Sequence, residues 1–175
     1  MKPITDLHDL LINELKILYA IEAEELNELT QFIFKIKNEE LKLILQSRKD
    51  RTKIQIIRLE EALILLGERP SKIKESKFLK IHFEETKNIL KIITELSVVE
   101  AQIILCFQTI SHIEIASYGT LLSFAKIMNM NEVASLLEKS LNEEKKSDLQ
   151  LTILGEYKIN EDARVETFIS LGYMF

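Results

Sequence analysis

The sequence predicts an all-α protein built as a four-helix bundle, and three observations lead to this prediction. Apolar residues recur every three to four positions over long stretches, which is the period of an amphipathic helix. Only four Gly and two Pro occur among 175 residues, so few tight turns are available. No segment alternates apolar and polar residues between turn signals, as a half-buried strand does. Long helices with short connections satisfy all three observations.

The first two helices are bounded by start and stop signals. Asp6 precedes the first apolar repeat and predicts a helix that continues to about residues 37–38. A second helix is expected over residues 39–66, because Gly67 can close it and Pro70 cannot continue it. The expected inward residues are Leu18, Glu22, Leu26, Leu29 and Ile33 in the first helix, and Leu41, Leu45, Thr52, Leu59, Ala62 and Leu66 in the second.

The second half of the chain predicts a long connection and two more long helices. In order, the expected elements are a polar crossover at 68–75, a weaker helix at about 78–95, a long helix at about 97–128, a turn at 129–131 and a long helix at 132–154. Gly155 is expected to end the last helix, and Asn160 begins one more short helical segment.

Two helices, a long crossover and two further helices make the ferritin-like arrangement of a four-helix bundle. We expect a single domain over residues 1–175. The bundle core covers about residues 5–155, and a short C-terminal tail covers residues 156–175.

Composition and charge narrow the classes of partner. The net charge of −5 and the pI near 5.4 argue against nucleic acid. The single cysteine, Cys106, excludes an internal disulfide and a cysteine-based zinc site. Glu100 and Gln108 interrupt the longest apolar stretches, so no membrane span is expected. We therefore expect a cytoplasmic protein.

Polar residues interrupt the inward stripes near the middle of each long helix. A carboxylate on a core stripe must be paired, protonated or bound to a metal. Antiparallel helices in register would bring these residues into one buried polar layer. Tyr19 and Tyr118 are expected to bond carboxylates of that layer. The layer residues are Glu22 in the first helix, Arg48, Arg51, Thr52 and Gln55 in the second, Ser111 and Glu114 in the third, and Glu144 and Asp148 in the fourth.

A layer of this kind is how helical bundles hold two iron or manganese ions. The usual ligands are a carboxylate from each of two helices and a Glu-x-x-His pair from each of the other two. None of His8, His82 and His112 has a glutamate three residues before it. His112 lies two residues before Glu114 and therefore projects to another side of its helix.

Three motifs give the chain a resemblance to a known family. Residues 112–121 read HIEIASYGTL, residues 18–22 read LYAIE, and residues 136–148 contain LL followed after five residues by EEKKSD. With these motifs the chain resembles the ferritin-like bacterial stress proteins of the YciF/YciE type, whose third-helix signature is EHYEIASYGTL. The resemblance covers about residues 5–155. It implies a ferritin-like bundle, a homodimer, a candidate di-metal centre and a role in stress response.

The same resemblance implies that several metal ligands are missing. The family carries H-x-x-E-T in its second helix. When the motif is aligned on Thr52, this chain has Arg48 in place of the family's histidine and Arg51 in place of its glutamate. In the third-helix signature, Ser111 takes the place of the first glutamate. The acidic positions of the family that remain acidic are Glu22, Glu114 and Glu144.

Arginine cannot ligate a metal, because its guanidinium stays protonated and offers only donors. It can supply the positive charge that buried carboxylates require. Two arginines against three or four carboxylates still leave a negative excess, which a raised pKa on one carboxylate or trapped water must relieve. We therefore expect a non-catalytic, metal-free, stress-associated protein with an arginine–carboxylate network, acting as a homo-oligomer.

Two alternatives remain open at this point. One is a metal-binding oxidase or iron-handling protein that retains iron or manganese on Glu22, Glu114 and Glu144. The other is a helical binding module for a small apolar ligand or a partner helix.

Overall fold

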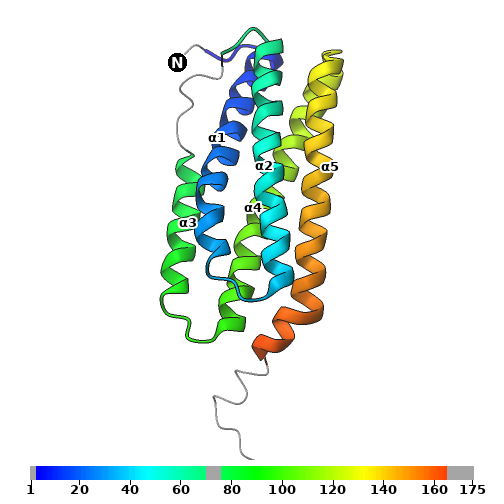
Figure 1. Cartoon of the computed structure of the whole chain (residues 1–175). Helices are drawn as coiled ribbons and strands as arrows, with labels where there is room; N and C mark the ends of the chain where they lie inside the picture. Colours follow the sequence, from blue (N-terminus) through cyan, green and yellow to red (C-terminus); the bar gives the residue numbers. More distant parts are fainter. Residues whose placement is uncertain (1–2, 70–75, 165–175) are drawn as a thin grey trace, which may run out of the picture.

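The computed structural model describes residues 3–69 and 76–164, which are helical apart from short connections (Figure 1). No strand occurs within these two ranges, so the all-α bundle prediction is confirmed. The elements are α1 (Leu7–Ile33), α2 (Glu39–Leu65), α3 (Lys77–Leu90), α4 (Leu96–Ile127), α5 (Asn131–Leu154) and a π-helical turn, η1 (Gly155–Ile159).

The four long helices form a square in which neighbours run antiparallel. Helix α1 packs against α2 and α4, and α5 packs against the same two helices from the opposite corner (Figure 1). Helix α3 lies outside the square, along α1 and α4. The connection from α2 to α4 therefore carries a helix of its own, as the sequence predicts. Residues 70–75 of the crossover and 165–175 of the predicted tail lie outside the described residues.

Two apolar clusters fill the bundle, and a buried polar layer separates them. One cluster includes Leu15, Leu59 and Leu137, and the other includes Leu29, Leu45 and Leu151. In every long helix the change from one cluster to the other occurs at buried polar residues or directly beside them. These residues are Glu22 and Glu25 in α1, Arg48, Thr52 and Gln55 in α2, Ser111 and Glu114 in α4, and Glu144 and Ser147 in α5.

An aromatic cluster attaches α3 to the bundle. The ring centroids of Phe32 and Phe83 lie 5.5 Å apart, and those of Phe83 and Phe107 lie 6.2 Å apart. The rings of Phe32 and Phe107 meet edge to face at 5.5 Å. Aromatic pairs favour such tilted geometries. Helix α3 therefore completes the apolar cluster on one side of the polar layer.

Helix α1 ends at Ile33, earlier than predicted, because α4 holds the next segment. The buried Glu100 of α4 accepts hydrogen bonds from the backbone N–H groups of Lys37 at 2.9 Å and Asn38 at 2.7 Å. Those two groups are therefore not available for a continuing helix. Asn38 then caps α2 through its own side chain.

The predicted end of the last helix at Gly155 is wrong. Gly155 has helical backbone angles, φ −61° and ψ −55°, and the chain continues through η1 into a helical turn at 160–164. The wider π turn brings Ile159 into the core, where it is buried. By contrast, Gly67 adopts a left-handed φ of 76° and closes α2 where the sequence predicts it.

Helix α4 is the one helix in the described ranges whose length and apolar composition would suffice to cross a membrane. One face of the helix, which includes Ile103, Phe107 and Leu121, is buried against the other helices, whereas Leu105 is exposed. Cys106 is buried among them, and burial raises the pKa of its thiol to about 12. Packing in the core accounts for the apolar character of the buried face of this helix.

The Glu100 contact predicts a clear loss of stability on mutation. Glu100→Ala leaves two backbone N–H groups without their carboxylate acceptor, so we expect the free energy of unfolding to fall by about 2–3 kcal/mol. Urea denaturation followed by circular dichroism measures this change. Glu100→Gln keeps one acceptor oxygen and should lose less than half as much. Wild-type stability of Glu100→Ala would contradict the assigned contact.

Candidate functional site

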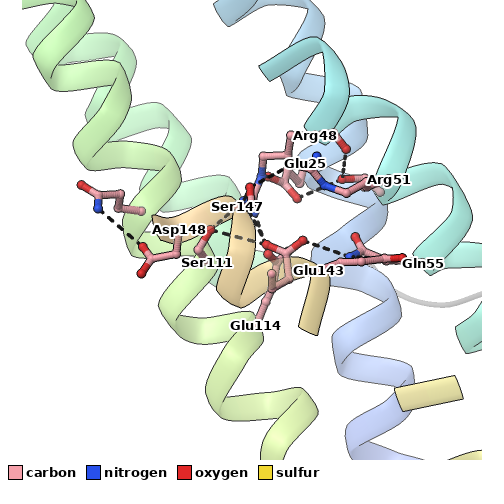
Figure 2. A network of polar contacts seen from close by, with 12 residues as sticks. Glu25, Arg48, Arg51, Gln55, Ser111, Glu114, Glu143, Ser147 and Asp148 are labelled. Atoms are coloured by element: carbon pink, nitrogen blue, oxygen red, sulfur yellow. Dashed lines mark hydrogen bonds and ion pairs between the residues drawn. The ribbon is translucent and has the colours of Figure 1, made fainter. Parts of the chain in front are cut away.

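The polar layer is centred on the side chain of Arg48, which is completely buried (Figure 2). Its Nε donates to Glu25, its Nη2 donates to Glu114 Oε2 at 2.6 Å, and its Nη1 lies 3.0 Å from Glu144 Oε2. Arg48 comes from α2, and the three carboxylates come from α1, α4 and α5. Each guanidinium nitrogen therefore faces a carboxylate from a different helix, and one side chain connects all four long helices.

Short hydroxyl and amide side chains complete the surroundings of Arg48. Its Nη1 also donates to Ser111 Oγ at 2.6 Å and to Ser147 Oγ at 3.2 Å. The amide of Gln55 donates to Glu144 Oε1 at 3.0 Å. The guanidinium carbon lies 5.9 Å from the ring centre of Phe107. Serine at 111 and 147 leaves room for the arginine while providing acceptors for it.

Glu22 belongs to the layer without bonding Arg48 directly. Tyr118 donates its hydroxyl to Glu22 Oε1 at 2.6 Å, as the sequence predicts for this tyrosine. Glu22 Oε2 and Glu114 Oε1 are buried and have no hydrogen-bond partner among the described residues. Four fully or almost fully buried carboxyl groups thus surround a single fully buried guanidinium.

The protonation of the layer follows from this imbalance of charge. Burial raises the pKa values of Glu22 and Glu114 well above the ordinary value, and repulsion between neighbouring carboxylates raises them further. Burial also acts to raise the pKa of Glu144, but Arg48 and Gln55 outweigh it and lower that pKa. Burial acts to lower the pKa of Arg48, and the surrounding carboxylates, Glu144 first, raise it more. The charged form of the guanidinium is therefore favoured, and Glu22 and Glu114 keep their protons to a higher pH than ordinary carboxyl groups, which lessens the negative excess.

Arg51, the second predicted arginine, lies at the rim of the layer. It is half-buried and donates to Ser47 Oγ at 2.7 Å and Ser147 Oγ at 3.0 Å. Burial lowers the pKa of its guanidinium, while the charge of Glu144 acts in the opposite direction. Ser147 therefore bonds both arginines and joins the rim to the centre (Figure 2).

Asp148 does not belong to the buried layer, contrary to the sequence-based prediction. Its carboxylate lies 3.5 Å from Gln108 Nε2 and 3.6 Å from His112 Nε2, away from Arg48 (Figure 2). The inward line of α5 instead passes through Glu144 and Ser147. A helix turns about 100° per residue, so the residue after Ser147 faces the outer edge of α4.

Sequence reasoning missed Glu25 and Ser147 as members of the layer. The prediction placed Leu26 on the inward stripe, whereas Leu26 is half-buried and Glu25 is fully buried. The available signal was the spacing of Glu25, which lies three residues after Glu22 and four before Leu29. This spacing places all three side chains on one face of α1.

Two nearby expectations, for Tyr19 and His112, have different outcomes. Tyr19 donates to Glu60 at 2.8 Å, so the prediction that it bonds a layer carboxylate is wrong. His112 is exposed and projects away from Glu114, as its spacing predicts. Glu143 is half-buried, and both of its carboxylate oxygens accept hydrogen bonds from Arg58, at 2.6 and 2.8 Å.

The layer does not fit the two-metal centre that the family resemblance implies. Carboxylate oxygens of Glu22, Glu25 and Glu114 lie within 4.8 Å of one another, a spacing that suits one hard cation. Arg48 already donates to two of these three groups, and its positive charge would stand beside the ion. No histidine of the described ranges contributes an imidazole to the layer. We therefore derive no chemistry through a metal at this site.

The fold and the layer define an all-α bundle with an internal arginine–carboxylate centre. The chain belongs to the family described as a domain of unknown function, DUF892, whose model matches residues 6–164. This membership covers all the helices of the bundle, and it confirms the resemblance that the sequence motifs indicate.

Individual proteins with similar sequences and structures agree with this family membership. Protein YciF of Escherichia coli strain K12 is 30% identical over 159 residues, which cover 90% of this chain and 95% of YciF. The crystal structure of the E. coli stress protein YciF matches with a TM-score of 0.80 at 29% identity, covering 90% of this chain and 99% of that one. YcfI of Rhodopseudomonas palustris, provisionally assigned a structural role, matches with a TM-score of 0.81 at 29% identity, over 86% and 96% of the two chains.

The central position of Arg48 predicts a large loss of stability when its side chain is removed. Arg48→Ala leaves Glu25, Glu114 and Glu144 without their shared donor, and we expect the free energy of unfolding to fall by about 3–5 kcal/mol. Chemical denaturation measures the difference. Arg51→Ala is the matched control on the same helix and should lose about 1 kcal/mol or less, because Arg51 is at the rim. Equal losses in the two variants would contradict the assigned centre.

The raised pKa values of Glu22 and Glu114 predict that stability declines as the pH rises. Above the ordinary carboxyl pKa of 4.5 the unfolded state has released protons that the native state still holds, so ∂ΔG/∂pH of unfolding is negative until the native groups ionise. The pKa of Glu144 is lowered, so this group stabilises the native state above the ordinary carboxyl pKa. That contribution is lost in acid, as the pH falls through the lowered pKa. Thermal unfolding across a pH series tests the slope. Glu22→Gln removes one of the two titrations and should make the decline shallower, and a wild-type midpoint that increases steadily with pH would refute the assignment.

Proposed function

We propose that this protein is a non-catalytic, stress-associated structural bundle in which Arg48 takes the place of the di-metal centre. One observation carries the proposal. A single buried guanidinium bonds carboxylates from three other helices, at the level where the family resemblance implies metal ligands. It supplies a positive charge and fixed donors, as a bound cation supplies charge and coordination.

The filled centre supports the absence of metal-based catalysis. Metal catalysis requires a coordination position open to substrate or water. The nitrogens of Arg48 occupy the space between Glu25, Glu114 and Glu144 and are held there by hydrogen bonds to them. A permanently attached cation also makes the fold independent of metal supply.

The names of similar proteins support the stress-associated and structural parts of the proposal. YciF is named a stress protein, and YcfI has a provisional structural role. With 30% identity to YciF over 90% of the chain, a related role within the ferritin-like group is the simplest inference.

A single-ion site is the second candidate function. Glu22, Glu25 and Glu114 approach one another closely enough to bind one iron or manganese ion, and one oxygen each of Glu22 and Glu114 lacks a partner among the described residues. Such an ion would have to displace Arg48 or bind beside it, at a cost in electrostatic repulsion.

Metal analysis distinguishes the two candidates. We expect less than one-tenth equivalent of iron or manganese per chain after purification with either metal added, as measured by plasma mass spectrometry. A stoichiometric ion that is lost in Glu22→Gln and Glu114→Gln would overturn the proposal.

Restoring the missing ligands tests the same idea in reverse. The triple variant Arg48→His, Arg51→Glu, Ser111→Glu should bind iron or manganese and should unfold at a higher temperature when the metal is present, because binding stabilises the native state. Arg58→His, on the same helix but outside the layer, should bind none. If the triple variant folds and binds no metal, these three positions do not account for the difference between an arginine centre and a metal centre.

A further inference from the structure

Two loops at one end of the bundle carry the two most exposed large apolar side chains of the described residues. The loops join α1 to α2 and α3 to α4, and both lie at the lower end of the bundle in Figure 1. Phe34 of the first loop is 85% exposed, and Ile92 of the second loop is 81% exposed. We call these two residues the loop tips. Side chains this exposed add little to the core, so their place at one end needs another explanation.

The loop tips adjoin a pocket that is lined by both apolar and basic side chains. The pocket measures about 300 Å³ and lies between the C-terminal ends of α1 and α3. Phe32 and Leu90 supply its apolar lining, and Lys35, Lys87 and Lys91 supply its positive charges. Lys35 and Lys91 are also the direct sequence neighbours of the two loop tips. The tips and the pocket therefore form one surface, which we call the loop surface.

Three lysines of the loop surface have no carboxylate partner among the described residues. Lys35 and Lys37 are exposed and form no ion pair there. Lys91 is also exposed and donates to the neutral Oδ1 of Asn88 at 2.9 Å. Glu95 is the one acidic residue that the two loops contain. The loop surface therefore combines two apolar tips with an excess of positive charge, although the chain as a whole is acidic.

Several acidic side chains near the loop surface are already neutralised by lysines of the protein. These ion pairs are Glu28 with Lys87, Glu39 with Lys42, and Glu40 with Lys158. Tyr157 of η1 is 76% exposed at the same end of the bundle. Its neighbour Glu156 is also exposed, and further exposed acidic residues follow at 161–162. We therefore place the contact on the two loops and not on η1.

We propose that the loop surface binds membranes that contain anionic phospholipids. Phe34 and Ile92 enter the boundary between headgroups and acyl chains, and the lysines beside them bind lipid phosphates. Single apolar tips with neighbouring lysines suit a bilayer, because a bilayer accepts individual side chains without a complementary shape and leaves the ammonium groups in water. The contact is made at the membrane surface and is not a membrane span. It is independent of the role of Arg48, whose layer lies midway along the bundle.

Vesicle flotation tests the apolar tips. The wild-type chain should bind vesicles of equal parts phosphatidylglycerol and phosphatidylcholine, and high salt should weaken binding by screening the charges. Phe34→Ser and Ile92→Ser should each weaken binding about tenfold, because one apolar side chain no longer leaves water. Ile127→Ser is the matched control, since Ile127 is 71% exposed and lies at the opposite end.

Circular dichroism establishes that each variant is folded. The proposal is overturned if the wild-type chain does not bind these vesicles, or if folded Phe34→Ser and Ile92→Ser bind as well as Ile127→Ser.

Neutralising the lysines tests the electrostatic part. Lys35→Gln and Lys91→Gln should each weaken binding about fivefold, the contribution of one lysine near an anionic membrane surface. Lys126→Gln, beside Ile127 at the opposite end, should bind as the wild type does. Vesicles of phosphatidylcholine alone should bind all of these proteins weakly. Equal affinity for the two kinds of vesicle would refute the recognition of anionic lipid.

Tryptophan fluorescence tests which end meets the lipid. The chain contains no tryptophan, so a single introduced indole reports its own surroundings. Emission from Phe34→Trp should shift to shorter wavelength when phosphatidylglycerol vesicles are added, because the indole leaves water. Emission from Ile127→Trp should not change. A shift in Ile127→Trp without one in Phe34→Trp would overturn the assigned surface.

A shortened chain tests a competing occupant of the loop surface. Residues 165–175 lie outside the described residues, and their sequence contains Phe168, Ile169 and Phe175. Equal vesicle binding by the full chain and by a chain ending at Arg164 would support the loops as the contact. If only the shortened chain binds, residues 165–175 cover the loop surface in the full protein, and the proposal is wrong.

Discussion

The burial of one guanidinium among four carboxyl groups is the constraint on which the rest of the structure depends. A charge removed from water must find compensation within a few ångströms, and Arg48 finds it on three other helices at once. Those contacts fix the relative height of α1, α2, α4 and α5. The apolar clusters on either side then pack around a layer whose position is already determined.

The same constraint explains the unusual protonation of the layer. A single guanidinium carries one positive charge, which is less than a divalent ion would supply. Four buried carboxyl groups surround it. Glu22 and Glu114 therefore retain protons more strongly than ordinary carboxyl groups, and the hydroxyl of Tyr118 satisfies one oxygen of Glu22. Small residues are equally necessary, because Ser111 and Ser147 accept hydrogen bonds from Arg48 within a space that larger side chains would fill.

The fold tolerates such a centre because the apolar clusters on both sides do not depend on it chemically. Leucine, isoleucine and phenylalanine side chains fill the bundle above and below, and α3 adds Phe83 to one of the clusters. The chain accordingly keeps the architecture of YciF, with a TM-score of 0.80 at 29% identity.

The sequence by itself determined the helices, their order and the depth of the polar layer, because these depend on apolar period, capping residues and the position of polar interruptions along each stripe. It also predicted that Arg48 belongs to that layer, where the structure places it. Only the tertiary structure decided which polar side chains meet. Glu25 enters the layer and Asp148 leaves it because a rotation of a few tens of degrees about a helix axis, set by packing against three neighbours, exchanges one inward residue for the next. The continuation of the chain through Gly155 was decided in the same way, by the burial of Ile159 against helices distant in the sequence.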